Sequence, residues 1–276
     1  MSHLWLRAET RDHEKRVGLT PQGAAKLIAT GMQVTVEDSA QRIIPTAEYA
    51  QAGCAIVDEG AWPDAPEDAI IFGLKELPED GKPLRHNHIM FGHAYKGQPA
   101  GKVLLDRFKA GGGVLYDLEY LTDDIGRRVA AFGYWAGYAG AAVALKCWIA
   151  GQSGALAAPV HDYPSANHLL MDLQQTLMAQ GTGRPTALII GALGRVGTGA
   201  ADLCQAMGVA TTKWDIAETA HGGPFPEVLA HDIFLNCILA RPGTPVFVPT
   251  SAETAPRSLS VIGDIACDPD SDFSPI

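Results

Sequence analysis

Residues 186–197 read Thr-Ala-Leu-Ile-Ile-Gly-Ala-Leu-Gly-Arg-Val-Gly, a short apolar run followed by three glycines at every third position. The apolar run is typical of a buried parallel strand, and the glycines allow a tight turn into a helix over residues 198–207. Gly191 and Gly194 let the backbone approach a pyrophosphate, which the N–H groups at the helix N-terminus can bind. The spacing is GxxGxxG rather than GxGxxG, so by itself it only suggests a dinucleotide site, and a turn that binds nothing is the alternative.

An acidic residue follows this turn where dinucleotide-binding folds carry one. Asp215 ends the next predicted strand, residues 209–215, and lies 18 residues after Gly197. Its carboxylate can accept hydrogen bonds from both hydroxyls of an adenine ribose, whereas it would repel a 2′-phosphate. The sequence therefore predicts NAD rather than NADP as the cofactor. For Arg195, a position at the pyrophosphate and a position in solvent both stay open.

Strand-length apolar runs alternate with segments of helical period along the whole chain, as in α/β proteins with mainly parallel sheets. Further strands are predicted at residues 4–7, 34–36, 70–74, 89–91, 114–118, 233–237 and 259–265, and further helices at residues 21–30, 103–109, 133–150 and 167–180. The helix over residues 133–150 is rich in alanine, glycine and aromatic residues, which indicates a buried helix linking two domains. We expect two Rossmann-like domains separated by a cleft: residues 1–133 bind the substrate and residues 134–276 bind NAD.

The composition narrows the class of partner. Of the 276 residues, 47% are hydrophobic, and 21 Lys and Arg against 31 Asp and Glu give a formal net charge of −10. Because the basic residues are scattered, the expected partner is a small molecule rather than nucleic acid or a membrane. Apolar runs fall short of the roughly 20 residues that span a bilayer, and the polar start is unlike a signal peptide. We therefore expect a cytoplasmic protein.

The cysteines indicate neither disulfides nor a metal site. The five are Cys54, Cys147, Cys204, Cys237 and Cys267, widely spaced, without a CxxC pair and without histidines at metal-ligand spacing. We expect reduced thiols that pack as small apolar side chains.

Charged residues follow two predicted strands of the first half. Lys75 comes directly after residues 70–74, and His93 comes two residues after residues 89–91. Open α/β sheets bind ligands at the carboxyl ends of their strands, where a partly desolvated lysine can act as a base and a histidine titrates near neutral pH. The alternatives are a solvated loop end for Lys75 and a hydrogen-bonded structural imidazole for His93.

Arginines suit a substrate with carboxylates, because paired guanidinium groups bind carboxylates in two-pronged geometry. Arg16, Arg127 and Arg128 are the candidates. Adjacent Arg127 and Arg128 point in different directions, so only one of them is expected to face a site. Most surface arginines bind nothing, so this pattern leaves the substrate open.

Eight blocks of the chain carry a family resemblance that extends over nearly its whole length. They are LRAET (6–10), IFGLKE (71–76), GHAYK (92–96), LYDLE (115–119), GRRVAAFG (126–133), LIIGALGR (188–195), KWD (213–215) and GGPF (222–225). In this order they resemble saccharopine dehydrogenases of the NAD-dependent, lysine-forming type. The resemblance implies a fold related to alanine dehydrogenase and the transhydrogenases. It also implies a reaction in which saccharopine, NAD and water give lysine, 2-oxoglutarate and NADH.

The resemblance also implies the site residues. Lys75 matches the base that deprotonates the secondary amine, His93 matches the acid–base group of the later steps, and Glu76 and Glu119 would tune Lys75. The implied substrate contacts are Arg16, Gln98, Arg127, Phe132, Ala266, Cys267 and Asp268. The implied cofactor contacts are Gly191, Gly194, Arg195, Asp215, Thr219 and Ile265.

The chain departs from the family at several positions. Val196 replaces a cysteine that fungal members carry in the glycine turn, so the family's disulfide to the position of Cys237 cannot form. Leu239 stands where a tyrosine contacts the cofactor, and Ala266 stands where a serine precedes the closing aspartate. The family continues beyond the position of Ile276 with a segment that returns to the first domain. We therefore expect a fragment whose first domain exposes apolar surface.

Three functions fit these observations. The resemblance favours oxidative deamination of saccharopine by a monomer or weak dimer. A related opine or alanine dehydrogenase is the alternative within the superfamily, but a small substrate with one carboxylate would not need Arg16, Arg127 and a third cation together. A catalytically silent NAD-binding homologue, with cofactor affinity but without turnover, is the third.

Overall fold

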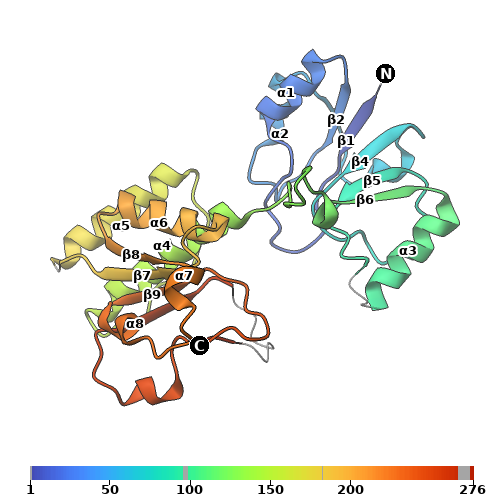
Figure 1. The fold of residues 1–276 in the computed structure, drawn as a ribbon. Coiled ribbons are helices and arrows are strands. Elements are labelled where there is room, and N and C mark those ends of the chain that lie inside the picture. The colour runs from blue at the N-terminus through green and yellow to red at the C-terminus, as the bar shows by residue number, and fades with distance from the viewer. Residues whose placement is uncertain (1, 96–98, 182, 267–273) are drawn as a thin grey trace. The chain divides into compact units, whose positions relative to one another are not determined.

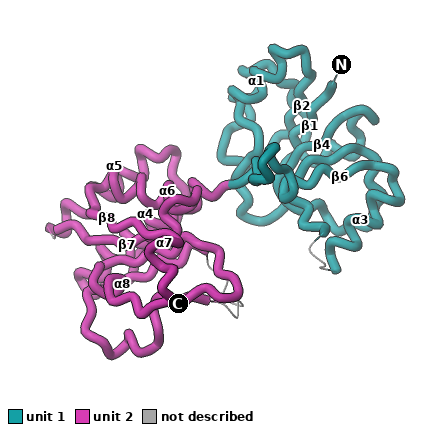
Figure 2. Tube along the Cα trace, in the orientation of Figure 1, with its two compact units in different colours: residues 1–131 teal, residues 132–276 magenta. Residues whose placement is uncertain are grey.

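The computed structural model describes residues 2–95, 99–181, 183–266 and 274–276, and the chain divides into two compact units. The first unit ends at Ala131 and the second begins at Phe132, as Figure 2 shows. Each unit has a parallel sheet between layers of helices (Figure 1). The predicted α/β fold with parallel sheets is confirmed.

The first unit has a six-stranded sheet in the order β3-β2-β1-β4-β5-β6. Its strands are β1 (His3–Leu6), β2 (Gln33–Glu37), β3 (Ala55–Val57), β4 (Ala69–Phe72), β5 (Asn87–Met90) and β6 (Val114–Asp117). Its helices are α1 (Pro21–Ala29), α2 (Thr46–Gln51) and α3 (Pro99–Gly111), with the 3₁₀ helices η1 (Trp62–Asp64) and η2 (Leu118–Tyr120). The strand order reverses between β1 and β4, and open α/β sheets bind their ligands at such a reversal, beyond the carboxyl ends of the strands.

Apolar side chains cover both faces of this sheet, because successive residues of a strand point to opposite faces. On one face, α1 and α2 pack through Ala24 and Tyr49 against β1 and β2. On the other face lie Trp5 and Ile71, with Phe108 of α3 in the neighbouring cluster. Because both faces of the sheet are covered, ligands can reach it only at the carboxyl edge, where the loops that follow the strands lie.

The second unit has a four-stranded parallel sheet in the order β10-β9-β7-β8. Its strands are β7 (Thr186–Ile190), β8 (Ala210–Trp214), β9 (Ile233–Asn236) and β10 (Val261–Asp264). Its helices are α4 (Gly133–Gly151), α5 (Ala166–Gln180), α6 (Arg195–Ala206), α7 (Ile216–Thr219) and α8 (Pro226–Ala230), with the 3₁₀ helix η3 (Thr250–Glu253). Here the strand order reverses between β7 and β9, next to the glycine turn that follows β7.

Helix α4, expected as the link between domains, begins at the boundary between the units and belongs to the second. It packs against α6 at backbone distance. A Cβ atom on Gly137 would lie 1.8 Å from the carbonyl oxygen of Val196, and one on Gly199 would lie 1.9 Å from that of Tyr134. Only glycine fits at these two positions, one on α4 and one on α6, so the close packing of the two helices depends on a glycine in each of them.

Two general expectations concern membranes and thiols. None of the helices among the described residues has the length and apolar character needed to cross a membrane. Of the cysteines, the four in the described part of the chain are free thiols, and Cys267 lies outside it. Burial raises the pKa of Cys204 to about 11 and that of Cys237 to about 12, so both behave as apolar side chains.

His88 of β5 lies in the core of the first unit, where 1% of its surface is exposed. Its ring contacts the rings of Trp62 and Phe108 edge-on, at centroid distances of 5.2 and 5.3 Å. Neither ring nitrogen has a hydrogen-bond partner among the described residues. Burial, assisted by the positive charge of Arg7, lowers the pKa of His88 to about 3.

We expect His88 to make the first unit sensitive to acid. The unfolded chain takes up a proton near the ordinary histidine pKa of about 6.5, whereas the folded chain does so only near pH 3. Stability is therefore lost as the pH falls from 6.5 towards 3, by about 3 kcal/mol at pH ~4.5. Urea unfolding at pH ~7 and ~4.5 should show a smaller loss for His88→Leu than for the wild type. An equal loss in both proteins would assign the acid sensitivity to other groups.

Candidate functional site

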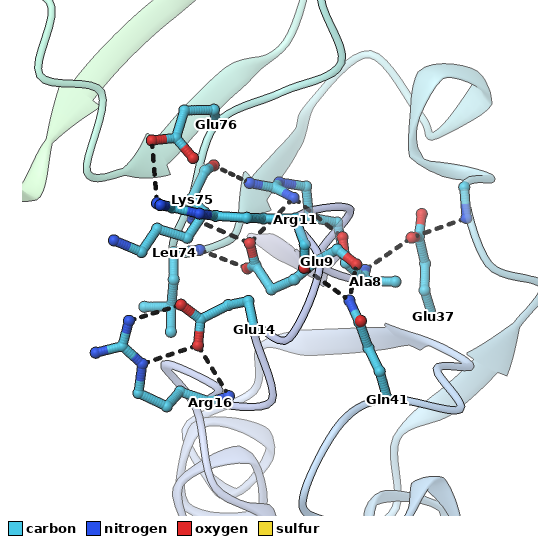
Figure 3. Close-up of polar contacts among 12 residues, drawn as sticks. Ala8, Glu9, Arg11, Glu14, Arg16, Glu37, Gln41, Leu74, Lys75 and Glu76 are labelled. Atoms are coloured by element: carbon cyan, nitrogen blue, oxygen red, sulfur yellow. Dashed lines mark hydrogen bonds and ion pairs between the residues drawn. The ribbon is translucent and has the colours of Figure 1, made fainter.

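Lys75 lies at the reversal point of the first sheet, where the loops after β1 and β4 run side by side because these strands pair directly. The residue is half-buried, and its backbone is held on both sides. Its N–H donates to Oε2 of Glu9 at 3.0 Å (Figure 3), and its carbonyl oxygen accepts from the guanidinium of Arg7. The adjacent N–H of Leu74 donates to Oε1 of Glu9 at 2.6 Å. Sequence reasoning singled out Lys75 but missed Arg7 and Glu9.

Arg16, on the long loop after β1, forms a bidentate pair with Glu14. Its Nε lies 2.8 Å from Oε1 and its Nη2 lies 2.6 Å from Oε2 of the carboxylate. The hydrogen bonds from Arg16 hold the pKa of Glu14 below its usual range, and the charge of Lys75 acts in the same direction. Glu14 is thus an anion near both Arg16 and Lys75. It was not predicted, although the strand-end argument that selected Lys75 applies to this loop as well.

The two glutamates expected to tune Lys75 each lie close to a further basic side chain. Glu76 lies 3.6 Å from Nη1 of Arg11 at the surface. Glu119 lies 3.9 Å from Nδ1 of His93 and accepts a hydrogen bond of 3.0 Å from Nη2 of Arg128. Glu119 thus belongs to the surroundings of His93, because β6 is the neighbour of β5 in the sheet.

His93 lies in the loop after β5 in a left-handed backbone conformation, with φ of 48°, which is rare for residues other than glycine. Its ring stacks on Phe91 with a centroid distance of 6.4 Å. One carboxylate oxygen of Asp117 accepts both the N–H of Gly92, at 3.2 Å, and that of Glu119, at 3.0 Å. Asp117, which sequence reasoning missed, therefore ties the His93 loop to the Glu119 loop.

A pocket of about 270 Å³ borders His93 in the first unit. It lies between the loop after β4, the loop after β5 and the beginning of α3, and its walls include Glu76, Leu77, His93, Gly101 and Arg107. Two of the predicted site residues, Glu76 and His93, therefore face one pocket although 17 positions of sequence separate them.

The remaining predicted substrate residues are spread over both units. Arg127 is exposed and pairs with Asp123 in a tight turn, through an N–H bond of 2.8 Å and an Nε–Oδ2 distance of 3.5 Å. Phe132 precedes the first turn of α4, and its side chain is exposed. Ala266 borders a small pocket that Leu239 also lines. Gln98, Cys267 and Asp268 lie outside the described residues.

The glycine turn has the geometry of a dinucleotide cradle. Gly191 has φ of 84°, and a Cβ there would lie 2.6 Å from a methyl group of Ile238. A Cβ on Gly197 would lie 2.1 Å from the carbonyl oxygen of Gly191. Gly194, in contrast, has φ of −75°, and the nearest atom to a Cβ would be 3.3 Å away. Folding therefore constrains this position less than it constrains Gly191 and Gly197, and the missing side chain leaves space before the N-terminus of α6 that a bound pyrophosphate would need.

Asp215 lies beside this turn. Its Oδ2 accepts the N–H of Leu193 at 3.1 Å, and its Oδ1 accepts that of Ile216 at 2.9 Å. The Thr219 hydroxyl donates to the carbonyl oxygen of Asp215 at 3.0 Å. The predicted acid and the glycine turn are therefore brought together at the carboxyl ends of β7 and β8, as an adenine ribose beside a pyrophosphate would need.

The other two predicted cofactor residues lie near the same edge of the second sheet. Ile265, one residue beyond β10, donates its N–H to the carbonyl oxygen of Asn236 at 3.0 Å. Its side chain lies against α4, where a Cβ on Gly140 would be 2.6 Å away. Arg195 opens α6, and its side chain is exposed.

The fold of this α/β protein is similar to that of alanine dehydrogenases and transhydrogenases. Residues 5–139 match the family model described as alanine dehydrogenase/PNT, N-terminal domain. Among solved structures, an L-alanine dehydrogenase superposes with a TM-score of 0.57 at 17% identity, over 91% of this chain and 70% of that one. A transhydrogenase from Sinorhizobium meliloti superposes with a TM-score of 0.59 at 18% identity, over 94% and 75%. These likenesses show the fold.

Closer relatives specify the family. The chain is 44% identical to the saccharopine dehydrogenase [NAD(+), L-lysine-forming] of Schizosaccharomyces pombe, over 99% of this chain and 77% of that protein. It is 47% identical to the protein of the same name from Emericella nidulans, over 99% and 76%. The chain belongs to the family of NAD-dependent, L-lysine-forming saccharopine dehydrogenases, and the resemblance inferred from the sequence blocks is confirmed.

Proposed function

We propose that this protein is an oxidoreductase that uses NAD to deaminate saccharopine oxidatively and reversibly to L-lysine and 2-oxoglutarate, a reaction of lysine metabolism. The names of relatives that are 43–47% identical over 99% of the chain support this. The structural observation that carries the proposal is the half-buried Lys75 at the reversal point of the first sheet, with the Glu14–Arg16 pair nearby.

The second unit holds NAD in this proposal, and the first holds the substrate. Gly191, Gly194 and the N-terminus of α6 receive the pyrophosphate, and Asp215 receives the hydroxyls of the adenine ribose. The carboxylate of Asp215 already lies at the turn, where it would repel the 2′-phosphate of NADP. When bound, NAD accepts a hydride from the substrate.

Lys75 takes the proton of the secondary amine of saccharopine, so the nitrogen lone pair forms the C=N bond as hydride leaves the adjacent carbon. His93 then moves protons while water adds to the imine carbon and the C–N bond to lysine breaks. In sum, saccharopine, NAD⁺ and water give lysine, 2-oxoglutarate, NADH and one proton. We further propose Arg16 and Arg127 as ligands of substrate carboxylates, because guanidinium groups bind carboxylates strongly.

Steady-state assays test this function. Purified protein mixed with saccharopine and NAD should produce reduced nicotinamide, measured by its absorbance. The rate should be much lower when NADP replaces NAD, because of Asp215, and when alanine replaces saccharopine. Turnover of alanine without turnover of saccharopine would favour the alanine dehydrogenase alternative. Binding of NAD without turnover of any of these substrates would favour the silent homologue.

We also propose that the enzyme works in the cytoplasm. The free thiols of the four described cysteines support this, because a reducing compartment keeps thiols in that state. Fractionation of the source cells, followed by assay of saccharopine oxidation in each fraction, tests it.

A further inference from the structure

The loop after β1 carries a buried ion pair, Arg7 and Glu9, of which only 2% and 8% are exposed. Arg7 Nη1 lies 3.4 Å from Glu9 Oε2. Burial lowers the pKa of the Arg7 guanidinium, while the charges of Glu9 and Glu37 oppose this shift. Removing two charges from water is costly, and apolar side chains often serve stability equally well. The cost of burying this pair therefore suggests that it has a role besides stabilising the fold.

Both charged groups of the pair form hydrogen bonds with the backbone of Lys75. The Glu9 carboxylate accepts two successive N–H groups, those of Leu74 and Lys75, one on each oxygen. The guanidinium of Arg7 donates to the carbonyl oxygen of Lys75 and, at 3.0 Å, to that of Ala8. Both backbone polar groups of Lys75 are thus bound by the Arg7–Glu9 pair, and Figure 3 shows the Glu9 side chain beside Leu74 and Lys75.

The chain around Lys75 is shaped to receive this pair. A Cβ on Gly73 would lie 2.4 Å from Nε and 2.5 Å from Cζ of Arg7, so the guanidinium lies directly against the backbone of Gly73. The N–H of Gly73 donates to the carbonyl oxygen of Ile89 at 3.1 Å, which ties this point to β5. The segment that leads from β4 to Lys75 is therefore fixed by contacts with the strands on both sides of it.

We propose that Glu9, together with Arg7, is a positioning residue for the acid–base chemistry of Lys75, an inference that rests on the proposed function. Lysine is a flexible side chain with four rotatable bonds, and a loop at a sheet edge is ordinarily mobile. Hydrogen bonds to both the N–H and the carbonyl oxygen of Lys75 fix its backbone, and therefore the position from which its side chain extends. Catalysis is sensitive to such placement, since an error of about 1 Å can cost ~100-fold in rate.

The substitution Glu9→Gln tests the proposal in the full chain. An amide keeps the length of the side chain but presents one NH₂ group where two N–H groups must be accepted, and it removes the charge opposite Arg7. We expect kcat for saccharopine oxidation to fall by roughly 10- to 100-fold, KM to change by less than about 3-fold and the Kd for NAD to stay unchanged. Amide hydrogen exchange at Leu74 and Lys75 should become faster.

Glu37→Gln is the matched control. Glu37 is buried at the same edge and accepts the N–H groups of Ala8, Gly60 and Trp62, at 2.9, 3.0 and 2.6 Å, rather than those of the Lys75 segment. The Glu37→Gln variant measures the effect of converting a buried carboxylate to an amide at a position that does not bind the backbone of Lys75. We expect a lower Tm with kcat within about 3-fold of the wild type.

Two results would overturn the inference: equal losses of kcat in both variants, or an unchanged kcat in Glu9→Gln despite faster exchange at Lys75. A wild-type protein without saccharopine turnover would instead contradict the proposed function. In that case, the exchange rates at Leu74 and Lys75 still decide whether Glu9 holds this segment, and unchanged rates would overturn the inference.

Discussion

Replacing Lys75 by methionine is expected to lower kcat for saccharopine oxidation by about 10²- to 10⁴-fold, the range that a general base contributes. Methionine keeps a long unbranched stem but lacks the amine that would take the proton. The contacts of Lys75 with Glu9 and Arg7 are made by its backbone, so the loop should keep its shape. The Kd for NAD should not change, because the proposed cofactor residues lie in the second unit. Steady-state kinetics and a calorimetric titration with NAD measure the two quantities.

Lys102→Met gives the matched control for this substitution. Lys102 lies on α3, exposed, with its Nζ 2.7 Å from Asp106. An exposed pair of this kind contributes little, so we expect kcat within about 2-fold of the wild type. A Lys75→Met variant with the wild-type rate would remove Lys75 from the mechanism. A loss of similar size in Lys102→Met would show that the effect does not depend on the position of the amine.

Most of the fold could be predicted from hydrophobic period and glycine positions, but boundaries and weak elements could not. Helix α6 begins at Arg195, three residues before the predicted start at residue 198, because Gly194 serves as its N-cap and no polar side chain marks that position. Strand β3 was missed because it has three residues, two of them exposed, at the edge of the sheet. Helix α2 was also missed, because it follows Pro45, which offers no capping side chain that would mark the start of a helix.

Some residues of the candidate site could likewise be predicted from the sequence, whereas their contacts with one another could not. Lys75 and Asp215 could be selected because they follow apolar strands, a property that can be read locally. The partner Glu9 lies 66 positions before Lys75, and only the pairing of β1 with β4 makes the two neighbours. The contact of Glu119 with His93 could not be predicted, because it depends on the strand order, which places β6 next to β5. Local sequence patterns thus indicate which residues belong to a site, whereas the strand order of the sheet determines which other residues they contact.

The substitution Gly137→Ala is expected to destabilise the second unit by about 3 kcal/mol or more. The added methyl group would lie 1.8 Å from the carbonyl oxygen of Val196, a backbone atom that can move only if α6 moves. Because α6 begins at the glycine turn, its displacement should also weaken NAD binding. Urea unfolding followed by tryptophan fluorescence, with NAD titration of the folded protein, measures both effects.

A second glycine of the same helix separates this packing effect from the effect of alanine in a helix. Nothing lies within 4 Å of a Cβ on Gly151, at the end of α4, so Gly151→Ala should be neutral or stabilising by up to about 1 kcal/mol. Gly199→Ala meets the mirror-image obstacle, the carbonyl oxygen of Tyr134 at 1.9 Å, and should resemble Gly137→Ala. Once either methyl group has forced α4 and α6 apart, the other has room. The double variant should therefore cost less than the sum of the two single variants, whereas additive costs would mean that each site yields locally without separating the helices.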